Sequence, residues 1–185
     1  LQAQLGMVGS ITVDAFTLID LLNELWEGNF EDMPDVFASF WAMQYNCPNC
    51  LAAMEGIEDY TLFLPDVNAL NALQDMMNLN QFDMLNIPDM EDILEYHIIE
   101  GSYLAEDLEP GMVLSTLNGE DALVGENASG LTIDGVNIIA TDFVADNGVF
   151  HVINYGMAPS TSPEATVYQI VVDSPNHTLF EQEIN

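Results

Sequence analysis

The chain contains no lysine and no arginine. Its 185 residues include 31 aspartates and glutamates, which give a formal net charge of -31 at pH 7 with the histidines neutral. Binding to nucleic acid or to an anionic membrane depends on lysine and arginine, so we expect neither as a partner. Repulsion among the carboxylates must be screened by salt, bridged by divalent metal or relieved at low pH. An incomplete sequence, from which basic segments are missing, is the alternative explanation.

Catalytic and membrane-spanning motifs are absent as well. The sequence has no run of 18 or more apolar residues, which is about the length that a transmembrane helix needs. It has no G-x-S-x-G, no H-E-x-x-H and no glycine-rich phosphate loop. We therefore expect no enzyme and no cofactor. Because 49% of the residues are hydrophobic, the chain has enough apolar side chains to fold as one large domain with extensions.

The spacing of apolar residues changes along the chain. It is helical through residues 12–45, with a break near residue 28, and alternates after about residue 110. Asn-Gly or Asp-Gly dipeptides at Gly119, Gly135 and Gly148 predict tight hairpin turns. Helices first and hairpins later predict an α+β fold, a β-wedge or sandwich with helices packed on one side. The other predicted elements are helices at 67–77 and 89–95 and strands at 59–64, 96–99, 131–133, 136–142 and 149–155.

Two stretches carry a family resemblance, residues 94–103 (LEYHIIEGSY) and 147–154 (NGVFHVIN). They resemble the signature blocks of fasciclin-type adhesion domains, and blocks between and after them follow in family order, at residues 115–119, 131–140 and 157–159. The resemblance covers roughly residues 60–160. It departs from the family pattern at Asp66 and Val67, where the family usually has a small hydroxyl residue and then Asp or Asn. Asp66 is still expected to cap the helix that follows.

The resemblance implies a fasciclin fold and an extracellular protein, secreted or at the cell surface. It also marks Tyr96 and His97 as candidates for adhesion contacts. The residues themselves favour a different interpretation, in which both lie on a half-buried strand and form hydrogen bonds inside the wedge. His151 alternates with apolar neighbours and is predicted to be a core histidine.

Cys47 and Cys50, spaced as Cys-Pro-Asn-Cys, are the only cysteines. This spacing occurs in redox motifs and in zinc sites, but a zinc site needs further ligands and no thioredoxin-like pattern surrounds the pair. The extracellular location that the resemblance implies favours a disulfide, either local to this loop or between neighbouring chains. Asn127 and Asn176 stand in glycosylation sequons, which agree with secretion.

Acidic clusters raise the question of calcium. The candidate calcium ligands are Asp89, Glu91 and Asp92, because calcium prefers several carboxylate oxygens. No EF-hand loop occurs. The alternative is a solvated acidic face with dispersed cation screening, in which calcium acts as a structural or screening ion.

The end of the chain extends beyond one fasciclin domain. We divide the sequence into an N-terminal extension at 1–10, a domain at 11–159, a linker at 160–165 and a segment at 166–185 that resembles the start of a further fasciclin domain. That segment begins a missing domain, packs on its own domain or is donated to a neighbouring copy. Its apolar residues, the self-assembly candidates, are Val167, Ile170, Val171, Leu179, Phe180 and Ile184.

We therefore predict a secreted adhesion or matrix protein that assembles head-to-tail into a polymer or filament through its C-terminal segment. The alternative is a non-polymerising adhesion module, a fragment of a tandem protein, that binds a receptor or a polysaccharide. A secreted binder of a small apolar ligand is a third class that the residues leave open.

Overall fold

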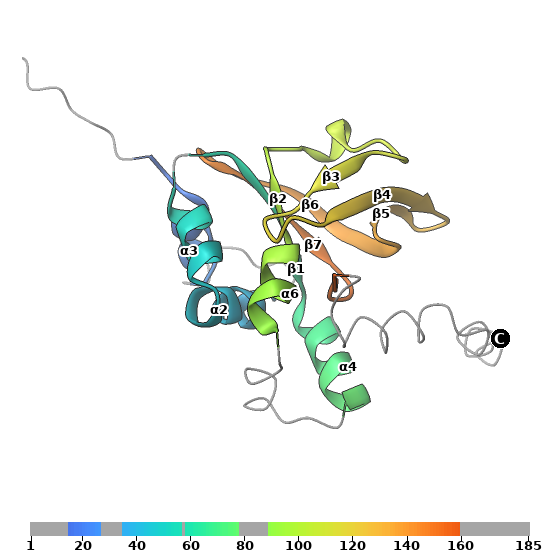
Figure 1. The fold of residues 1–185 in the computed structure, drawn as a ribbon, viewed down its shortest axis with the longest axis horizontal. Coiled ribbons are helices and arrows are strands. Elements are labelled where there is room, and N and C mark those ends of the chain that lie inside the picture. The colour runs from blue at the N-terminus through green and yellow to red at the C-terminus, as the bar shows by residue number, and fades with distance from the viewer. Residues whose placement is uncertain (1–14, 27–34, 57, 78–88, 160–185) are drawn as a thin grey trace, which may run out of the picture.

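Helices gather on one side of a strongly bent sheet (Figure 1). The computed structural model describes residues 15–26, 35–56, 58–77 and 89–159. Its helices are α1 (Leu18–Trp26), α2 (Phe37–Asn46), α3 (Pro48–Glu55), α4 (Val67–Met77), α6 (Met90–Tyr96) and the 3-10 turn η1 (Ala105–Asp107). Its strands are β1 (Tyr60–Pro65), β2 (Ile98–Glu100), β3 (Val113–Ser115), β4 (Asp121–Asn127), β5 (Gly130–Ile133), β6 (Val136–Ala145) and β7 (Gly148–Ile153).

The sheet has the strand order β2-β1-β7-β6-β5-β4-β3. Its neighbouring strands are antiparallel except β1 and β7, which run parallel from Tyr60 opposite Gly148 to Pro65 opposite Ile153. The two ends of the sheet approach each other, since the N–H of Leu117 donates to the carbonyl of Ile98 at 2.8 Å. This near closure protects edges that would otherwise be open to other strands.

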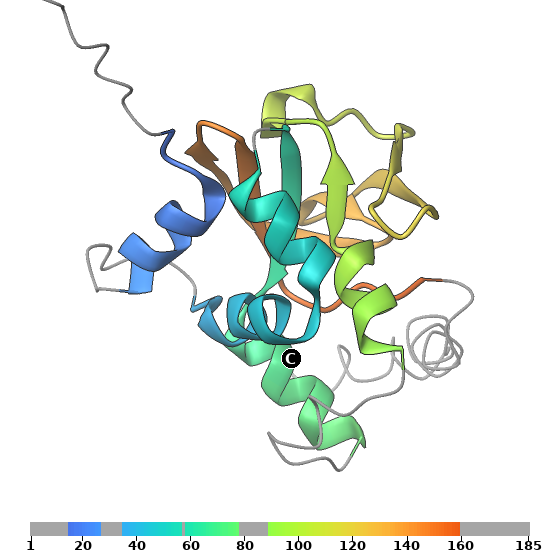
Figure 2. The ribbon, with the colours of Figure 1, turned by 60° about the vertical axis from the view of Figure 1, so that its left-hand side comes forward.

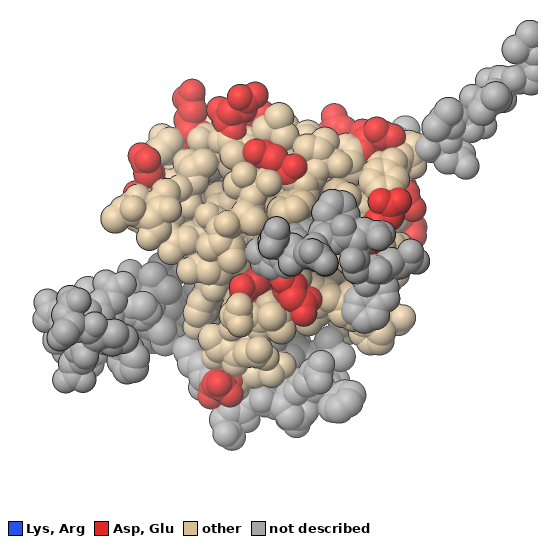
Figure 3. Space-filling view, turned by 180° about the vertical axis from the view of Figure 1, so that it is seen from behind, with Lys and Arg blue, Asp and Glu red and all other residues tan. Residues whose placement is uncertain are grey.

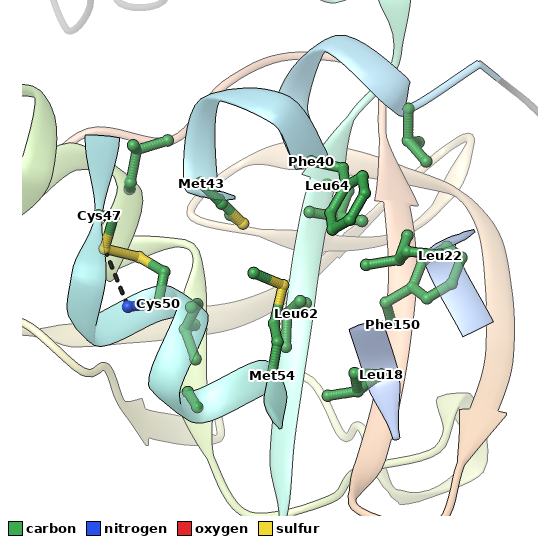
Figure 4. Packing of buried hydrophobic residues seen from close by; sticks show 14 of the residues in the cluster. Leu18, Leu22, Phe40, Met43, Cys47, Cys50, Met54, Leu62, Leu64 and Phe150 are labelled. Carbon is green, nitrogen blue, oxygen red and sulfur yellow. Dashed lines mark hydrogen bonds between the residues drawn. A yellow bond between two sulfur atoms is a disulfide. The ribbon is translucent and has the colours of Figure 1, made fainter. Parts of the chain in front are cut away.

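Side chains alternate between two cores along the central strands. On β1, Leu62 and Leu64 pack under the helices, and Phe63 points into the wedge. Figure 4 shows the core under the helices, where Phe40 and Met54 meet Leu62 and Leu64. Burial on both faces of the strand explains why β1 is apolar from Leu62 to Pro65.

A single amide joins three segments at one end of the domain. Asn147 is 2% exposed. Its Oδ1 accepts from the N–H of Leu18 at the start of α1 (2.7 Å), and its Nδ2 donates to the carbonyls of Met54 (3.0 Å) and Gly56 (2.8 Å). This residue fixes the first and third helices against the β6–β7 turn.

The α+β prediction is confirmed, with some elements changed. Asp66 caps α4 as predicted, since its Oδ1 accepts from the N–H of Ala69 at 2.8 Å. The predicted strand at 96–99 is wrong at its start, because Tyr96 ends α6 and the N–H of His97 donates to the carbonyl of Leu94 at 3.1 Å. Helix α3 and strands β3 and β4 were not predicted. The N-terminal extension, the linker and the segment at 166–185 lie outside the described residues.

Candidate functional site

Tyr96 and His97 lie at the junction where α6 turns into β2. Tyr96 is the last residue of the helix, and His97 follows as its C-terminal cap. The carbonyl of His97 accepts from the N–H of Phe63 at 2.9 Å, which anchors the junction to β1. Both side chains are buried, with 5% of Tyr96 and 3% of His97 exposed. The pair therefore lies inside the domain.

The phenol of Tyr96 spans the wedge. Its hydroxyl donates to Oδ2 of Asp134 at 2.7 Å, and the carbonyl of Asp121 lies 3.2 Å from the same oxygen. Burial, and then the hydrogen bond to Asp134, raise the pKa of Tyr96 well above its usual value. The phenol stays protonated and acts as a donor.

The imidazole of His97 joins α6 to the end of the domain. Its Nδ1 lies 2.7 Å from the carbonyl of Ile93, and its Nε2 lies 2.8 Å from the N–H of Met157. Nε2 accepts a hydrogen bond from the N–H of Met157, so the ring is neutral and carries its proton on Nδ1, which donates a hydrogen bond to the carbonyl of Ile93. Burial lowers the pKa of His97 to about 4, in accord with a neutral ring.

His151 is held in the same way on β7. The N–H of Asp142 lies 3.2 Å from its Nδ1, and its Nε2 lies 2.8 Å from the carbonyl of Tyr103. Burial lowers the pKa of His151 as well. The two histidines that the structure describes thus use both ring nitrogens on backbone groups, which leaves neither nitrogen for a ligand or a substrate.

The cysteine motif opens a helix instead of lying in a loop. Cys47 and Cys50 form a disulfide, and the N–H of Cys50 donates to Sγ of Cys47 at 3.1 Å. Pro48 occupies the first turn of α3, where its missing N–H removes no helical hydrogen bond. Both cysteines are fully buried. The described bridge is local to one chain.

The calcium candidates do not converge on one point. In the described part of the chain, the group of three potential metal ligands brings together Cys47, Glu91 and Glu95, whose ligand atoms lie within 4.8 Å of one another. The sulfur of Cys47 is in a disulfide, and Glu95 accepts from the amide of Asn49 at 2.6 Å. Asp89 and Asp92 are exposed on the first turn of α6 and stand outside this group.

The remaining predicted sites divide between surface and undescribed residues. Asn127 is exposed at the end of β4, where its Nδ2 donates to Oδ1 of Asn137 at 2.6 Å and its own Oδ1 accepts from the N–H of Ser129 at 2.8 Å. Asn176 and the six self-assembly candidates lie outside the described residues. The acidic side chains form separate patches on the face shown in Figure 3, with no basic side chain between them.

One surface feature was missed at the sequence level. Trp41 and Tyr45, on the outer face of α2, are 45% and 65% exposed, and the prediction of helices packed on one side of the sheet did not single them out as surface residues. The signal was present, because α2 has two apolar faces. One face, with Phe40 and Met43, enters the core, and the other carries the aromatic residues.

None of the helices that the structure describes is long and apolar enough to cross a lipid bilayer.

The described part of the molecule is a bent sheet that is almost closed, with helices on one side and a tyrosine–histidine junction where α6 turns into β2. Figure 2 shows the same grouping of helices from a second direction. These features define a fasciclin-type domain.

The comparisons with known proteins agree with this class. The model of the Fasciclin domain matches residues 42–159, so the chain belongs to the fasciclin-domain family. In the solved structure of a FAS1 domain pair from the insect cell adhesion molecule fasciclin I, a similar fold covers 70% of this chain and 49% of that chain. The TM-score is 0.56 at 19% sequence identity, which shows the fold alone.

Two of the relatives are much longer than this chain. Transforming growth factor-beta-induced protein ig-h3 of Sus scrofa is 33% identical over 134 residues, which are 70% of this chain and 19% of that protein. Periostin of Homo sapiens is 26% identical over 137 residues, 74% of this chain and 16% of that protein. The chain thus spans less than a fifth of the length of these two relatives.

Proposed function

We propose that this chain is a non-catalytic module of an extracellular adhesion or matrix protein, and that copies join head-to-tail through residues 166–184. The observation that carries the proposal is the fasciclin domain over residues 42–159. A solved structure with this fold comes from a cell adhesion molecule. In this proposal the apolar residues at 166–184 supply one of two different contact surfaces, and contact between two different surfaces propagates along a chain of copies.

The chemistry of the domain supports the extracellular location. The local disulfide between Cys47 and Cys50 suits an oxidising compartment. The sequon at Asn127 lies on an exposed hairpin, where a glycan would have room.

Adhesion through the Tyr96–His97 pair would have to be indirect. Both side chains are buried and hydrogen-bonded within the domain, so a receptor could reach neither without opening the wedge. We propose that the pair keeps the adhesive surface in shape, and that contacts with partners are made by exposed residues elsewhere.

Two long relatives favour a second candidate function. Because the chain spans 19% and 16% of two curated relatives, it also fits one module of a tandem protein. In that case residues 166–185 begin the next domain, and the module binds a cell-surface receptor or a polysaccharide without polymerising.

Sedimentation velocity of the full chain, followed over a range of protein and salt concentrations, separates the two. Assembly is expected to grow with protein concentration and with salt, because salt screens the repulsion between acidic copies. The comparison variant replaces the six apolar residues at 166–184 with serine and is expected to stay monomeric. A wild-type chain that remains monomeric under every condition supports the tandem module instead.

A further inference from the structure

Helix α2 carries an aromatic stripe, Phe37, Trp41 and Tyr45, at successive turns of the helix; Phe37 is half-buried and packs against the core, and the other two are exposed. The ring centroids of Trp41 and Tyr45 are 4.3 Å apart, and those of Phe37 and Trp41 are 6.3 Å apart. Trp41 and Tyr45 are 45% and 65% exposed. Adjacent exposed aromatic rings on one helix are typical of an interaction surface, because tyrosine and tryptophan are enriched in protein interfaces.

The stripe lies in a part of the sequence without charge. Residues 36–54, which include all of α2 and most of α3, contain no Asp or Glu, although 17% of the chain is charged. In a protein with a formal charge of -31, α2 itself therefore contains no carboxylate. The nearest acidic residue on its N-terminal side is Asp35, whose Oδ1 accepts from the N–H of Phe37 at 3.0 Å, at the far end of the stripe from Tyr45.

Other exposed apolar side chains have acidic neighbours. Val113 and Leu123 face each other across β3 and β4. The N–H of Leu123 donates to Oδ1 of Asp134 at 2.7 Å, which places a carboxylate at this pair. On β6, exposed Ile139 and Val144 are close in sequence to Asp142 and Asp146.

This difference in neighbouring carboxylates indicates which segment would bind the aromatic stripe of α2. Residues 166–184 carry six apolar side chains together with Asp173, Glu181 and Glu183, and no basic residue. Such a segment cannot form ion pairs with this protein through lysine or arginine, and it would be repelled by a surface rich in carboxylates. Val167, Ile170 and Val171 have the i, i+3, i+4 sequence spacing that places apolar anchors on one face of a helix, as in segments that bind partners through a helical face.

We propose that Trp41 and Tyr45, next to the half-buried Phe37, form the acceptor surface for residues 166–184 of a neighbouring copy. The inference rests on the head-to-tail assembly proposed above and gives that assembly its second surface. One copy donates its C-terminal segment, and the next copy receives it on α2. Because the donor and the acceptor are different surfaces, each copy keeps one of them free for a further subunit.

The test uses the full chain with Trp41→Ser and Tyr45→Ser together, and Val113→Ser with Leu123→Ser as the matched control. Both variants remove two exposed apolar side chains, but only the first alters α2. Sedimentation velocity is expected to show at least roughly tenfold weaker association for the α2 variant, as for loss of interface aromatics elsewhere, and wild-type association for the control. Circular dichroism checks that each variant is folded. If the double variant fails to fold, the single variant Tyr45→Asp, at the more exposed position, replaces it in the test.

A mixture of two variants tests the donor and the acceptor in one experiment. The α2 variant keeps its donor segment, and the chain with serine at the six positions of 166–184 keeps its acceptor. Each alone is expected to be monomeric, and an equimolar mixture is expected to form pairs that grow no further. Pairs in the mixture support both the donor and the acceptor.

The failures are distinguishable. If the wild type and the α2 variant assemble equally, or the mixture stays monomeric while the wild type assembles, α2 is not the acceptor and the head-to-tail proposal stands. If the serine-substituted segment leaves assembly intact, or the wild type never assembles, the head-to-tail proposal itself is overturned.

Discussion

The hydroxyl of Tyr96 donates a hydrogen bond of 2.7 Å to the carboxylate of Asp134. Asp134 has a positive φ of 49° in the β5–β6 turn, and its second carboxylate oxygen accepts from the N–H of Leu123 at 2.7 Å. The tyrosine of the signature pair thus ties the end of α6 to two strands at the far side of the wedge. These hydrogen bonds connect the helical side of the domain to the sheet.

Removing this hydroxyl tests its contribution. Tyr96→Phe leaves the ring in place and leaves one carboxylate oxygen of Asp134 without the phenol. We expect the free energy of unfolding to fall by about 1–3 kcal/mol, as for loss of a buried hydrogen bond to a charged group. Urea unfolding measures this fall, and Tyr45→Phe at the exposed position is the control, with an expected change within about 0.5 kcal/mol.

A double-mutant cycle assigns the effect to the pair. Asp134→Asn keeps a side chain that tolerates the left-handed backbone but removes the charge. If Tyr96→Phe costs the same free energy with Asn at position 134 as with Asp, the coupling between the two residues is absent and the proposed tie is wrong.

Lowering the pH is expected to reduce the contribution of His97 to the free energy of unfolding. The pKa of His97 is about 4 in the folded chain because of burial, below the value of 6.5 for an ordinary histidine. Between these values only the unfolded chain binds the proton, so the histidine's contribution is complete above pH 6.5 and declines as the pH falls toward 4. Its loss amounts to about 3 kcal/mol, at 1.36 kcal/mol for each pH unit.

Acid also weakens the repulsion among acidic side chains, which acts in the opposite direction. The measurement is therefore the difference in unfolding free energy between the wild type and His97→Gln, followed from pH 7.5 to 4.5. This difference is expected to shrink as the pH falls. A difference that stays constant over this range would show that His97 is not the titrating group.

Gly148 permits close contact between β7 and β1. Its φ is 143°, and a Cβ there would lie 2.0 Å from the carbonyl oxygen of Tyr60. We expect Gly148→Ala to lower the free energy of unfolding by roughly 3 kcal/mol or more, because backbone must move to make room. Gly135→Ala is the control, since Gly135 also has a positive φ (79°) but no atom lies within 4 Å of the added Cβ. It is expected to cost only about 1 kcal/mol, and equal losses in thermal or urea unfolding would contradict this account.

Salt is expected to stabilise the fold. Raising the salt from 0.01 M to 1 M shortens the Debye length from about 30 Å to about 3 Å and screens the net charge of -31. We propose that cations act here by dispersed screening, so CaCl2 and MgCl2 at equal ionic strength should raise the melting temperature equally. An additional rise with calcium that disappears in Asp92→Asn would instead identify a calcium site at Asp89, Glu91 and Asp92.

Much of the fold could be predicted because its signals are local. The Asp66 cap and the following helix at 67–77 depend on neighbouring residues, as do the hairpin turns at Gly119 and Gly135. The predicted strand at 96–99 is wrong at its start because a short segment with Tyr96 and two isoleucines fits both a strand and the end of a helix. Pro48 was the signal for α3, since proline is favoured in the first turn of a helix.

The site was less predictable because its contacts cross the chain. The partners of Tyr96 and His97, at Asp134 and Met157, are distant in sequence. Asn147 is a clearer case, because its three hydrogen bonds lead to α1 and to the end of α3. Nothing in the sequence around Asn147 distinguishes it from an ordinary turn asparagine. The sequence shows that α2 has two apolar faces, but only the structure shows which of them packs in the core and which is exposed.

The parallel pairing of β1 and β7 also bears on how the protein is made. Strand β1 lies between β2 and β7, but β7 begins at residue 148, long after β1 ends at residue 65. During synthesis β1 emerges well before the strand that completes it, and contacts between segments so far apart in sequence form slowly. A nascent chain cut short before β7 would expose a strand of apolar residues with one side unpaired, which is a target for chaperones and a risk for aggregation.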